Sequence, residues 1–256
     1  MDVTNRFVLD FAERYARSHA GARILDYGCG AGGLVAAGRG AGLEMFGADV
    51  YYGGSDTRKE AEQAGLFGGV IREIREGRLE FDDAYFDLVV NNQVMEHVAD
   101  LDAVLRETRR VLRPGGTLLS LFPSRDVFRE GHIGIPFSHW FRKGSRLRFA
   151  YTLTLRALGM GTWKEQAPTR RQWAIDKLKW IDTYTRYRSR REIFAAFNRH
   201  FGSEFREPDY IRFRLRDRRG LAPFARLLDL PLVPAAATAV FRKLAFLVMV
   251  SRKEPS

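Results

Sequence analysis

Residues 24–33, ILDYGCGAGG, lead from a short apolar run directly into a loop rich in glycine, and few folds accept such a sequence. Gly28, Gly30 and Gly33 have the G-x-G-x-x-G spacing of dinucleotide-binding folds, in which a tight turn joins a strand to the N-terminus of a helix. The pattern predicts a strand, a loop and a helix within a parallel sheet, with a ligand at the loop. It does not by itself identify that ligand.

Short apolar runs alternate with helical patterns through the first 120 residues. Strands are expected at 23–26, 44–49, 69–74, 86–91 and 117–122, and helices at 34–40, 56–64 and 101–112. The turn Arg113-Pro114-Gly115-Gly116 ends the last of these helices and leads into the next strand. Five strands separated by helices predict an α/β fold, a Rossmann-like sheet with helices on both faces.

This alternation stops after Pro123 and resumes at Ser189, which forms a capping-box pattern with Glu192 and predicts a helix at 190–201. An alternating segment at 204–216 predicts a strand, and 246–250 predicts the last strand. The expected division is a cofactor-binding core at 1–122, a largely helical inserted cap at 123–188, and the remainder of the core at 189–256. That last part contains an apolar insertion at 221–241, which three prolines interrupt.

Charge is unevenly distributed along the chain. Residues 1–120 carry 14 Lys and Arg against 19 Asp and Glu, whereas residues 121–256 carry 28 against 12. The basic half suggests contact with phosphates of a nucleic acid, an anionic membrane surface or a phosphorylated small molecule, although a solvated arginine-rich surface has the same composition. No apolar signal region opens the chain, and the apolar run 230–241 is too short to span a bilayer. We expect a cytoplasmic protein, at most associated with the inner face of the membrane.

Asp26 directly precedes the glycine loop, and its charge discriminates between ligands. A carboxylate at the end of the first strand would repel the pyrophosphate of a dinucleotide. S-adenosylmethionine has no phosphate and brings an ammonium and a sulfonium, which an acidic residue attracts. Asp26 therefore favours S-adenosylmethionine, and Asp49, at the end of the second expected strand, is placed to accept hydrogen bonds from ribose hydroxyls.

These segments together resemble the class I S-adenosylmethionine-dependent methyltransferases, in particular the broad bacterial small-molecule group that includes quinone-modifying enzymes. The resemblance is carried by ILDYGCGAGG, FGADVY, LEFDDAYFDLVVNNQVMEHVADLDAVLRETRRVLRPGGTLL and FLVMVSRK. It implies a seven-stranded sheet whose last strand is antiparallel, with the cofactor across the carboxyl ends of the first four strands. It assigns cofactor-binding roles to residues at four sites: Asp26, Gly28 and Gly30 at the methionine end, Asp49 at the ribose, Val50, Leu79 and Phe81 near adenine, and the backbone carbonyl of Asn91 at the ammonium.

The loop after the fourth expected strand narrows the class of acceptor that the enzyme could methylate. It reads Asn91-Asn92-Gln93-Val94, without the N-P-P-Y pattern of many nucleobase and amide N-methylating enzymes. Cytosine C5 methyltransferases need a cysteine nucleophile, and the single cysteine of this chain lies in the glycine loop. Both common nucleic-acid chemistries therefore lose support. The following Glu96-His97 resembles part of a metal-binding run in some quinone O-methyltransferases, but Gln93 replaces its first acidic ligand, and glutamine binds a hard cation less well than carboxylate does. We expect no metal here, and a structural role for Glu96 and His97.

Transfer of a methyl group to a hydroxyl requires alignment and removal of a proton. The cap segment EGHIGIPFSHW offers two histidines, and His132 is the first candidate for the general base, with His139 second. Tyr151 and Tyr184 could orient the acceptor. The sequence thus predicts O-methylation of a small, sugar- or lipid-linked acceptor, which can carry a phosphate. The alternatives are an RNA methyltransferase that uses the basic half and a non-catalytic binding protein. The sequence does not predict the oligomeric state.

Overall fold

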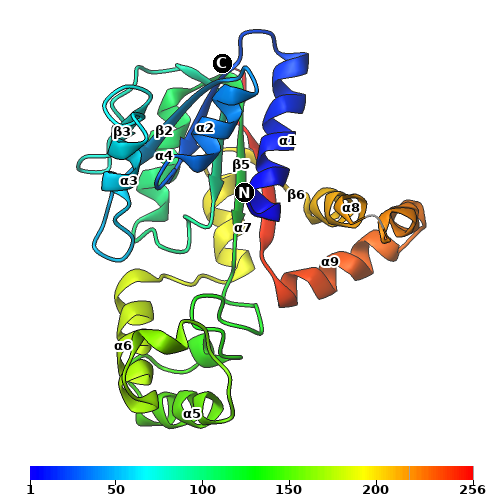
Figure 1. The fold of residues 1–256 in the computed structure, drawn as a ribbon. Helices are drawn as coiled ribbons and strands as arrows, with labels where there is room; N and C mark the ends of the chain where they lie inside the picture. The colour runs from blue at the N-terminus through cyan, green and yellow to red at the C-terminus, as the bar shows by residue number, and fades with distance from the viewer. Residues whose placement is uncertain (219, 256) are drawn as a thin grey trace.

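A computed structural model describes residues 1–218 and 220–255 of the chain, and its central element is a seven-stranded sheet (Figure 1). The strand order is β3-β2-β1-β4-β5-β7-β6. Strands β1 to β5 pair in parallel, and β7 is antiparallel to both of its neighbours. The strands are β1 (Arg23–Tyr27), β2 (Glu44–Asp49), β3 (Ile71–Glu73), β4 (Phe86–Asn92), β5 (Leu112–Phe122), β6 (Gly202–Phe205) and β7 (Leu247–Arg252). The predicted Rossmann-like sheet with an antiparallel last strand is confirmed.

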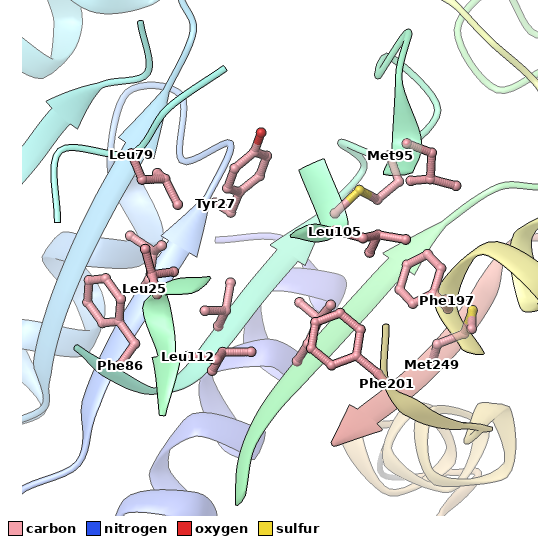
Figure 2. Close-up of a cluster of buried hydrophobic side chains, with 14 of the residues drawn as sticks. Leu25, Tyr27, Leu79, Phe86, Met95, Leu105, Leu112, Phe197, Phe201 and Met249 are labelled. Carbon is pink, nitrogen blue, oxygen red and sulfur yellow. The ribbon is translucent and has the colours of Figure 1, made fainter. Parts of the chain in front are cut away.

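Helices cover both faces of this sheet, as the alternation of apolar residues predicts. The helices outside the cap are α1 (Val3–Ser18), α2 (Gly33–Gly40), α3 (Arg58–Gln63), α4 (Leu101–Val111), α7 (Arg190–Asn198), α8 (Glu207–Asp217) and α9 (Val233–Leu244), with a 3₁₀ helix, η3, at Ala222–Asp229. Of these, η3 and α9 lie mainly against α8, to the side of the sheet (Figure 1). Neighbouring residues of β1 point to opposite faces: Leu25 packs into the cluster with Leu105 and Phe197 (Figure 2), and Ile24 packs with Phe7 and Leu34 on the other side. The core therefore consists of two apolar layers, one on each face.

The strand predicted at 204–216 is wrong. Only β6, Gly202–Phe205, is extended, and α8 begins at Glu207. Pro208 in the first turn and the acidic residues around it favour a helix start, and Tyr210 lies buried against α1. Arginines at alternate positions in this segment resemble a strand pattern. They lie instead on a helix that buries only a narrow stripe of residues. Helix α1, which Asp2 caps, was not among the predicted elements.

The chain leaves the carboxyl end of β5 and forms a separate layer of short helices before it returns at α7. This layer contains η1 (Ser138–Trp140), α5 (Arg146–Ala157), η2 (Lys164–Gln166) and α6 (Arg170–Tyr184). It has an apolar cluster of its own, centred on the fully buried Trp173 and including Ile133, Ile135 and Ile181. Figure 1 shows α5 and α6 beyond the end of the sheet at which the parallel strands terminate. Residues at that end of the sheet therefore face the helical layer.

Among the described residues, no single helix has both the length and the apolar composition of a membrane span. η3 and α9 reach that length and composition only when taken together, and they are bent relative to each other by 117°.

The predicted capping box at the start of α7 is present in full. Ser189 accepts a hydrogen bond from the backbone N–H of Glu192, and the Glu192 carboxylate accepts one from the backbone N–H of Ser189. We expect Ser189→Ala to lower the free energy of unfolding by about 1 kcal/mol, because it leaves an N-terminal N–H group without its partner. Ser189→Asp preserves an acceptor and serves as the control in urea denaturation. Equal stability of the alanine variant and the wild type would contradict the prediction.

Candidate active site

The glycine loop after β1 is shaped by close packing at two positions. Gly28 has φ +80°, and a Cβ atom there would lie 2.3 Å from Cγ2 of Val94, in the loop after β4. Gly32 has φ +81° and would place a Cβ 2.4 Å from the side chain of Ile71. Gly33, the third glycine of the sequence pattern, has open space around it. The structural requirement therefore falls on Gly28 and Gly32, and the G-x-G-x-x-G spacing overstates the role of Gly33.

Two carboxylates lie at the carboxyl ends of adjacent strands. Asp26 is buried in β1, and burial, with the nearby charge of Asp49, raises its pKa to about 7. Asp49 ends β2 and accepts hydrogen bonds from the backbone N–H groups of Gly30 (2.8 Å) and Tyr51 (3.0 Å). Asp49 thus fixes the glycine loop, and Asp26 is a buried carboxyl group that a cation would stabilise in its charged form.

The remaining predicted cofactor residues divide into exposed and buried positions. Val50 follows Asp49 and is exposed at the end of β2. The side chains of Leu79 and Phe81 are buried in the core, as Figure 2 shows for Leu79. The backbone N–H of Leu79 donates to Glu107, and the carbonyls of Leu79 and Phe81 accept from Arg110. Asn91 lies near the end of β4 with its side-chain amide donating to Ser120, at 2.9 Å. The structure places Asp26, Asp49 and Asn91 on three neighbouring strands, with Val50 beside them.

The segment after β2 connects this edge of the sheet to the helical layer. The ring of Tyr52 lies against Tyr184 of α6, with ring centroids 5.3 Å apart, and against His97, at 6.0 Å. The indole N–H of Trp180 donates to the backbone carbonyl of Gly54, at 3.3 Å. An aromatic wall, defined here as Tyr52, Trp180 and Tyr184, therefore joins the strand ends to the cap.

Glu96, His97 and His132 meet behind this wall. Each offers one ligand atom, and these atoms lie within 4.8 Å of one another. Burial raises the pKa of Glu96 to about 8, and both of its carboxylate oxygens lack a hydrogen-bond partner among the described residues. The Nδ1 atom of His97 contacts the carbonyl oxygen of Tyr184 at 2.8 Å, and burial lowers the pKa of this imidazole. The sequence pattern predicted a structural Glu-His pair, and the structure brings that pair to the first candidate base.

His132 is held in one orientation by two partners. Its Nδ1 lies 2.7 Å from the carboxylate of Glu130 and 3.1 Å from the hydroxyl of Tyr187, which also donates to Glu130. Burial lowers the pKa of His132, but the hydrogen bond and charge of Glu130, aided by Glu96, outweigh it and raise the pKa above its ordinary value. With Nδ1 bound to a carboxylate, Nε2 is the nitrogen that can accept a proton from another molecule.

The other residues considered for acceptor chemistry are less well placed. The ring of His139 lies against that of Tyr187 at an interplanar angle of 49°, and its Nε2 lies 3.1 Å from the carbonyl oxygen of Arg125. Its Nδ1 is buried without a partner among the described residues. Tyr151 packs on Phe141 within the cap, whereas Tyr184 belongs to the aromatic wall. Sequence reasoning missed Tyr187 and Tyr52, and did not assign a role to Glu130. Only the short spacing from Glu130 to His132 could have indicated that pair.

Comparison with known proteins shows which family and which relatives part of this chain resembles. Residues 25–120 match the family described as "Methyltransferase domain". The ubiquinone biosynthesis O-methyltransferase of Ruegeria pomeroyi is 42% identical over 101 residues, which cover 39% of this chain and 40% of that protein. The protein of the same name from Mesorhizobium japonicum is 39% identical over 109 residues, covering 41% of this chain and 42% of its own length. The chain thus matches about 40% of the length of these curated relatives.

A solved structure shares the fold over almost the whole chain. The S-adenosylmethionine-dependent methyltransferase from Mesorhizobium loti aligns with a TM-score of 0.52 and 20% identity, over 95% of this chain and 99% of its own. At this identity the likeness concerns the fold alone.

The two loop glycines provide a matched pair for a stability test. We expect Gly28→Ala to lower the free energy of unfolding by about 1–3 kcal/mol, because alanine at φ +80° is strained and its Cβ meets a β-branched side chain. Gly33→Ala, at the start of α2 and in open space, should leave stability unchanged or slightly higher. Thermal and urea unfolding of both variants measure this. Equal losses at the two positions would contradict the packing argument.

Proposed function

We propose that this chain is a class I S-adenosylmethionine-dependent methyltransferase that transfers a methyl group to a hydroxyl oxygen of a small, sugar- or lipid-linked acceptor. Residues 25–120 match a methyltransferase domain, and the chain shares the fold of such an enzyme. The observation that carries the proposal is the orientation of His132 by Glu130 and Tyr187 at the end of the sheet where Asp26 and Asp49 lie. In this proposal, residues 1–122 bind the methyl donor and the cap at 123–188 selects the acceptor.

On the donor side, we assign the ammonium and sulfonium of the cofactor to the surroundings of Asp26, Gly28, Gly30 and the Asn91 carbonyl. The raised pKa of Asp26 supports this assignment, because a buried carboxyl group with no hydrogen bond among the described residues gains most from a bound cation. Asp49 would accept from the ribose hydroxyls with the lone pairs that its two backbone bonds leave free. The adenine would lie beside Val50, against the backbone of residues 79–81.

On the acceptor side, His132 would accept the hydroxyl proton at Nε2 as the oxygen attacks the methyl carbon. The new carbon–oxygen bond forms while the carbon–sulfur bond breaks, and S-adenosylhomocysteine leaves. Glu130 stabilises the imidazolium that results, as a carboxylate beside a histidine does in other general-base sites. We assign no metal and no step to one; Glu96, with its raised pKa, and His97 would instead form the polar floor of the acceptor site.

The cap and the named relatives support a lipophilic aromatic acceptor of the quinone type. The relatives from Ruegeria pomeroyi and Mesorhizobium japonicum are named for O-methylation in ubiquinone biosynthesis, although the matched family domain ends at residue 120, before the cap. The aromatic wall offers flat apolar surfaces beside His97 and His132, suited to a ring that carries a hydroxyl. We place the reaction in the cytoplasm, at the inner face of the membrane when the acceptor carries a lipid.

The RNA alternative loses support from the way the cap uses its cations. Arg148 is buried and pairs with Asp182, and Lys143 donates to the backbone carbonyls of Asp182 and Thr185. Arg188 donates to the carbonyls of Val98 and Ala99. These cations hold the cap together and to the core, so the basic stretches of the sequence overstate the charge available to nucleic acid.

Asp26→Asn separates cofactor affinity from stability. We expect titration calorimetry to show a loss of S-adenosylmethionine affinity of about tenfold or more, because the site loses its negative charge. Wild-type affinity should fall as the pH drops through about 7, where Asp26 is protonated, and the variant should lack this dependence. In the ligand-free state the variant should unfold at a higher temperature than the wild type above that pH, since a raised carboxyl pKa means that stability is lost as the pH rises. Normal affinity of the variant would remove the assignment.

Glu130→Gln tests His132 as the base. We expect His132→Gln to reduce turnover by about 10²- to 10⁴-fold with little change in cofactor affinity. The wild-type rate should rise with pH through the raised pKa of His132, and Glu130→Gln should move this rise to lower pH while lowering the rate. The acceptors to screen are hydroxylated aromatic and lipid-linked compounds. An unchanged pH profile would dismiss the pair, and activity that disappears with a chelator would assign Glu96, His97 and His132 to a metal.

A further inference from the structure

η3 and α9 expose two rows of apolar side chains on their outer surface. In a 3₁₀ helix, residues three apart lie in one row, and the row of Ala225 and Leu228 is buried, whereas the row Leu221, Phe224 and Leu227 is exposed. In α9, residues four apart share a face, and Leu232, Val240 and Leu244 are 84%, 59% and 66% exposed. Each segment therefore packs one face on the protein and presents the other, apolar one to the outside.

These rows continue onto the cap through one short segment. The backbone N–H of Phe128 donates to the carbonyl of Lys243 at 2.7 Å, next to the exposed Leu244. Phe128 packs with Phe137 and Trp140, and all three are more than a third exposed. We define the apolar rim as the two helical rows together with these three aromatic residues. Figure 1 shows α9 running from the side of the core, where α8 lies, toward the cap.

The cations of this rim lack an acidic partner among the described residues, while its anions are paired. The Lys243 ammonium lies over the ring of Phe128, 5.6 Å from its centroid. Arg226 and Lys243 are exposed and have no ion pair among the described residues. Asp229 pairs with Arg212, and Asp217 pairs with Arg6. The surface that the rim offers is thus apolar and positively charged.

We propose that the apolar rim is the surface by which this protein docks on an anionic lipid bilayer, with η3, α9 and the aromatic residues of the cap in the interface. Apolar rows flanked by arginine and lysine suit the boundary between acyl chains and anionic headgroups. A second copy of this chain is a poorer occupant, because a twofold contact through the rim would bring its unpaired cations together. The apolar rows give a nucleic acid nothing to contact.

The geometry connects this surface to the proposed reaction. Residues 128–137 fold back on themselves, with Phe137 donating its backbone N–H to the carbonyl of Phe128 at 2.6 Å. Glu130 and His132 lie between these two aromatic residues in the chain. The inference rests on and deepens the proposed function, since docking through Phe128 and Phe137 would bring the segment that carries His132 to the lipid surface. Docking itself is measured without the reaction, so either proposal can fail while the other stands.

The test is co-sedimentation of the purified protein with vesicles of phosphatidylcholine, with and without phosphatidylglycerol. We expect binding to the anionic vesicles, and at least about tenfold weaker partitioning for Phe224→Ser/Leu227→Ser, which removes two apolar side chains that are about half exposed, 52% and 47%. The matched control is Leu147→Ser/Leu158→Ser, two exposed leucines of the α5 region, which should bind as the wild type does. Arg226→Gln/Lys243→Gln should lose the preference for anionic vesicles.

Three outcomes would overturn the inference. The first is equal binding of the wild type and of the Phe224→Ser/Leu227→Ser variant. The second is equal recovery with neutral and anionic vesicles. The third is a dimer in sedimentation velocity without lipid that the same variant dissociates, which would assign the rim to a second copy of the chain. Circular dichroism of each variant establishes that it is folded before vesicles are added.

Discussion

The parallel pairing of β1 with β2 and β4 brings the carboxyl ends of three strands to one edge of the sheet, and the site depends on this arrangement. Asp26, Asp49 and Asn91 are distant in sequence, yet each lies at or near the end of its own strand. The loops that follow carry the glycine turn, Tyr52, and the pair Glu96-His97 to the same place. Because the cap follows the end of β5, it meets these loops without any further change of direction.

Burial by itself raises the pKa of three carboxyl groups at this edge, and hydrogen bonds decide whether that effect prevails. Asp26 and Glu96 are buried carboxyl groups without hydrogen-bond partners among the described residues, and burial raises the pKa of both. Glu130 is also buried, yet His132, Tyr187 and the backbone N–H of Ile133 bond its carboxylate and lower its pKa. Under the proposed function Asp26 would lose its proton when the cationic cofactor enters the site, whereas hydrogen bonds keep Glu130 charged beside His132. The direction of the pKa shift therefore distinguishes the two carboxyl groups without hydrogen-bond partners from Glu130, which has three.

The sequence predicts the sheet well because strand and loop signals are local: apolar runs and glycines each act within a few residues. The turn predicted at 113–116 is instead the first part of β5, which begins directly after α4. It misplaces α8, since an arginine-rich helix with one narrow buried stripe alternates much as a strand does. It identifies Asp26, Asp49 and His132 as candidates from their position beside recognisable motifs. It cannot show that Glu96 and His97 meet His132, or that Tyr187 bonds Glu130, because these contacts join segments whose relative placement only the packed cap determines.

The position of β7 has a consequence for the order of folding. β7 lies between β5 and β6, so β6 has no partner in the sheet until residues 247–252 arrive, although β6 precedes them in the chain. Pairs of such high sequence separation form late, because a long loop must close first. The units from β1 to β5 can assemble from neighbouring segments, and α8, η3 and α9 lie within the loop that must close. We therefore expect hydrogen exchange to report two stages of protection, with β6 and α8 acquiring theirs only when β7 does.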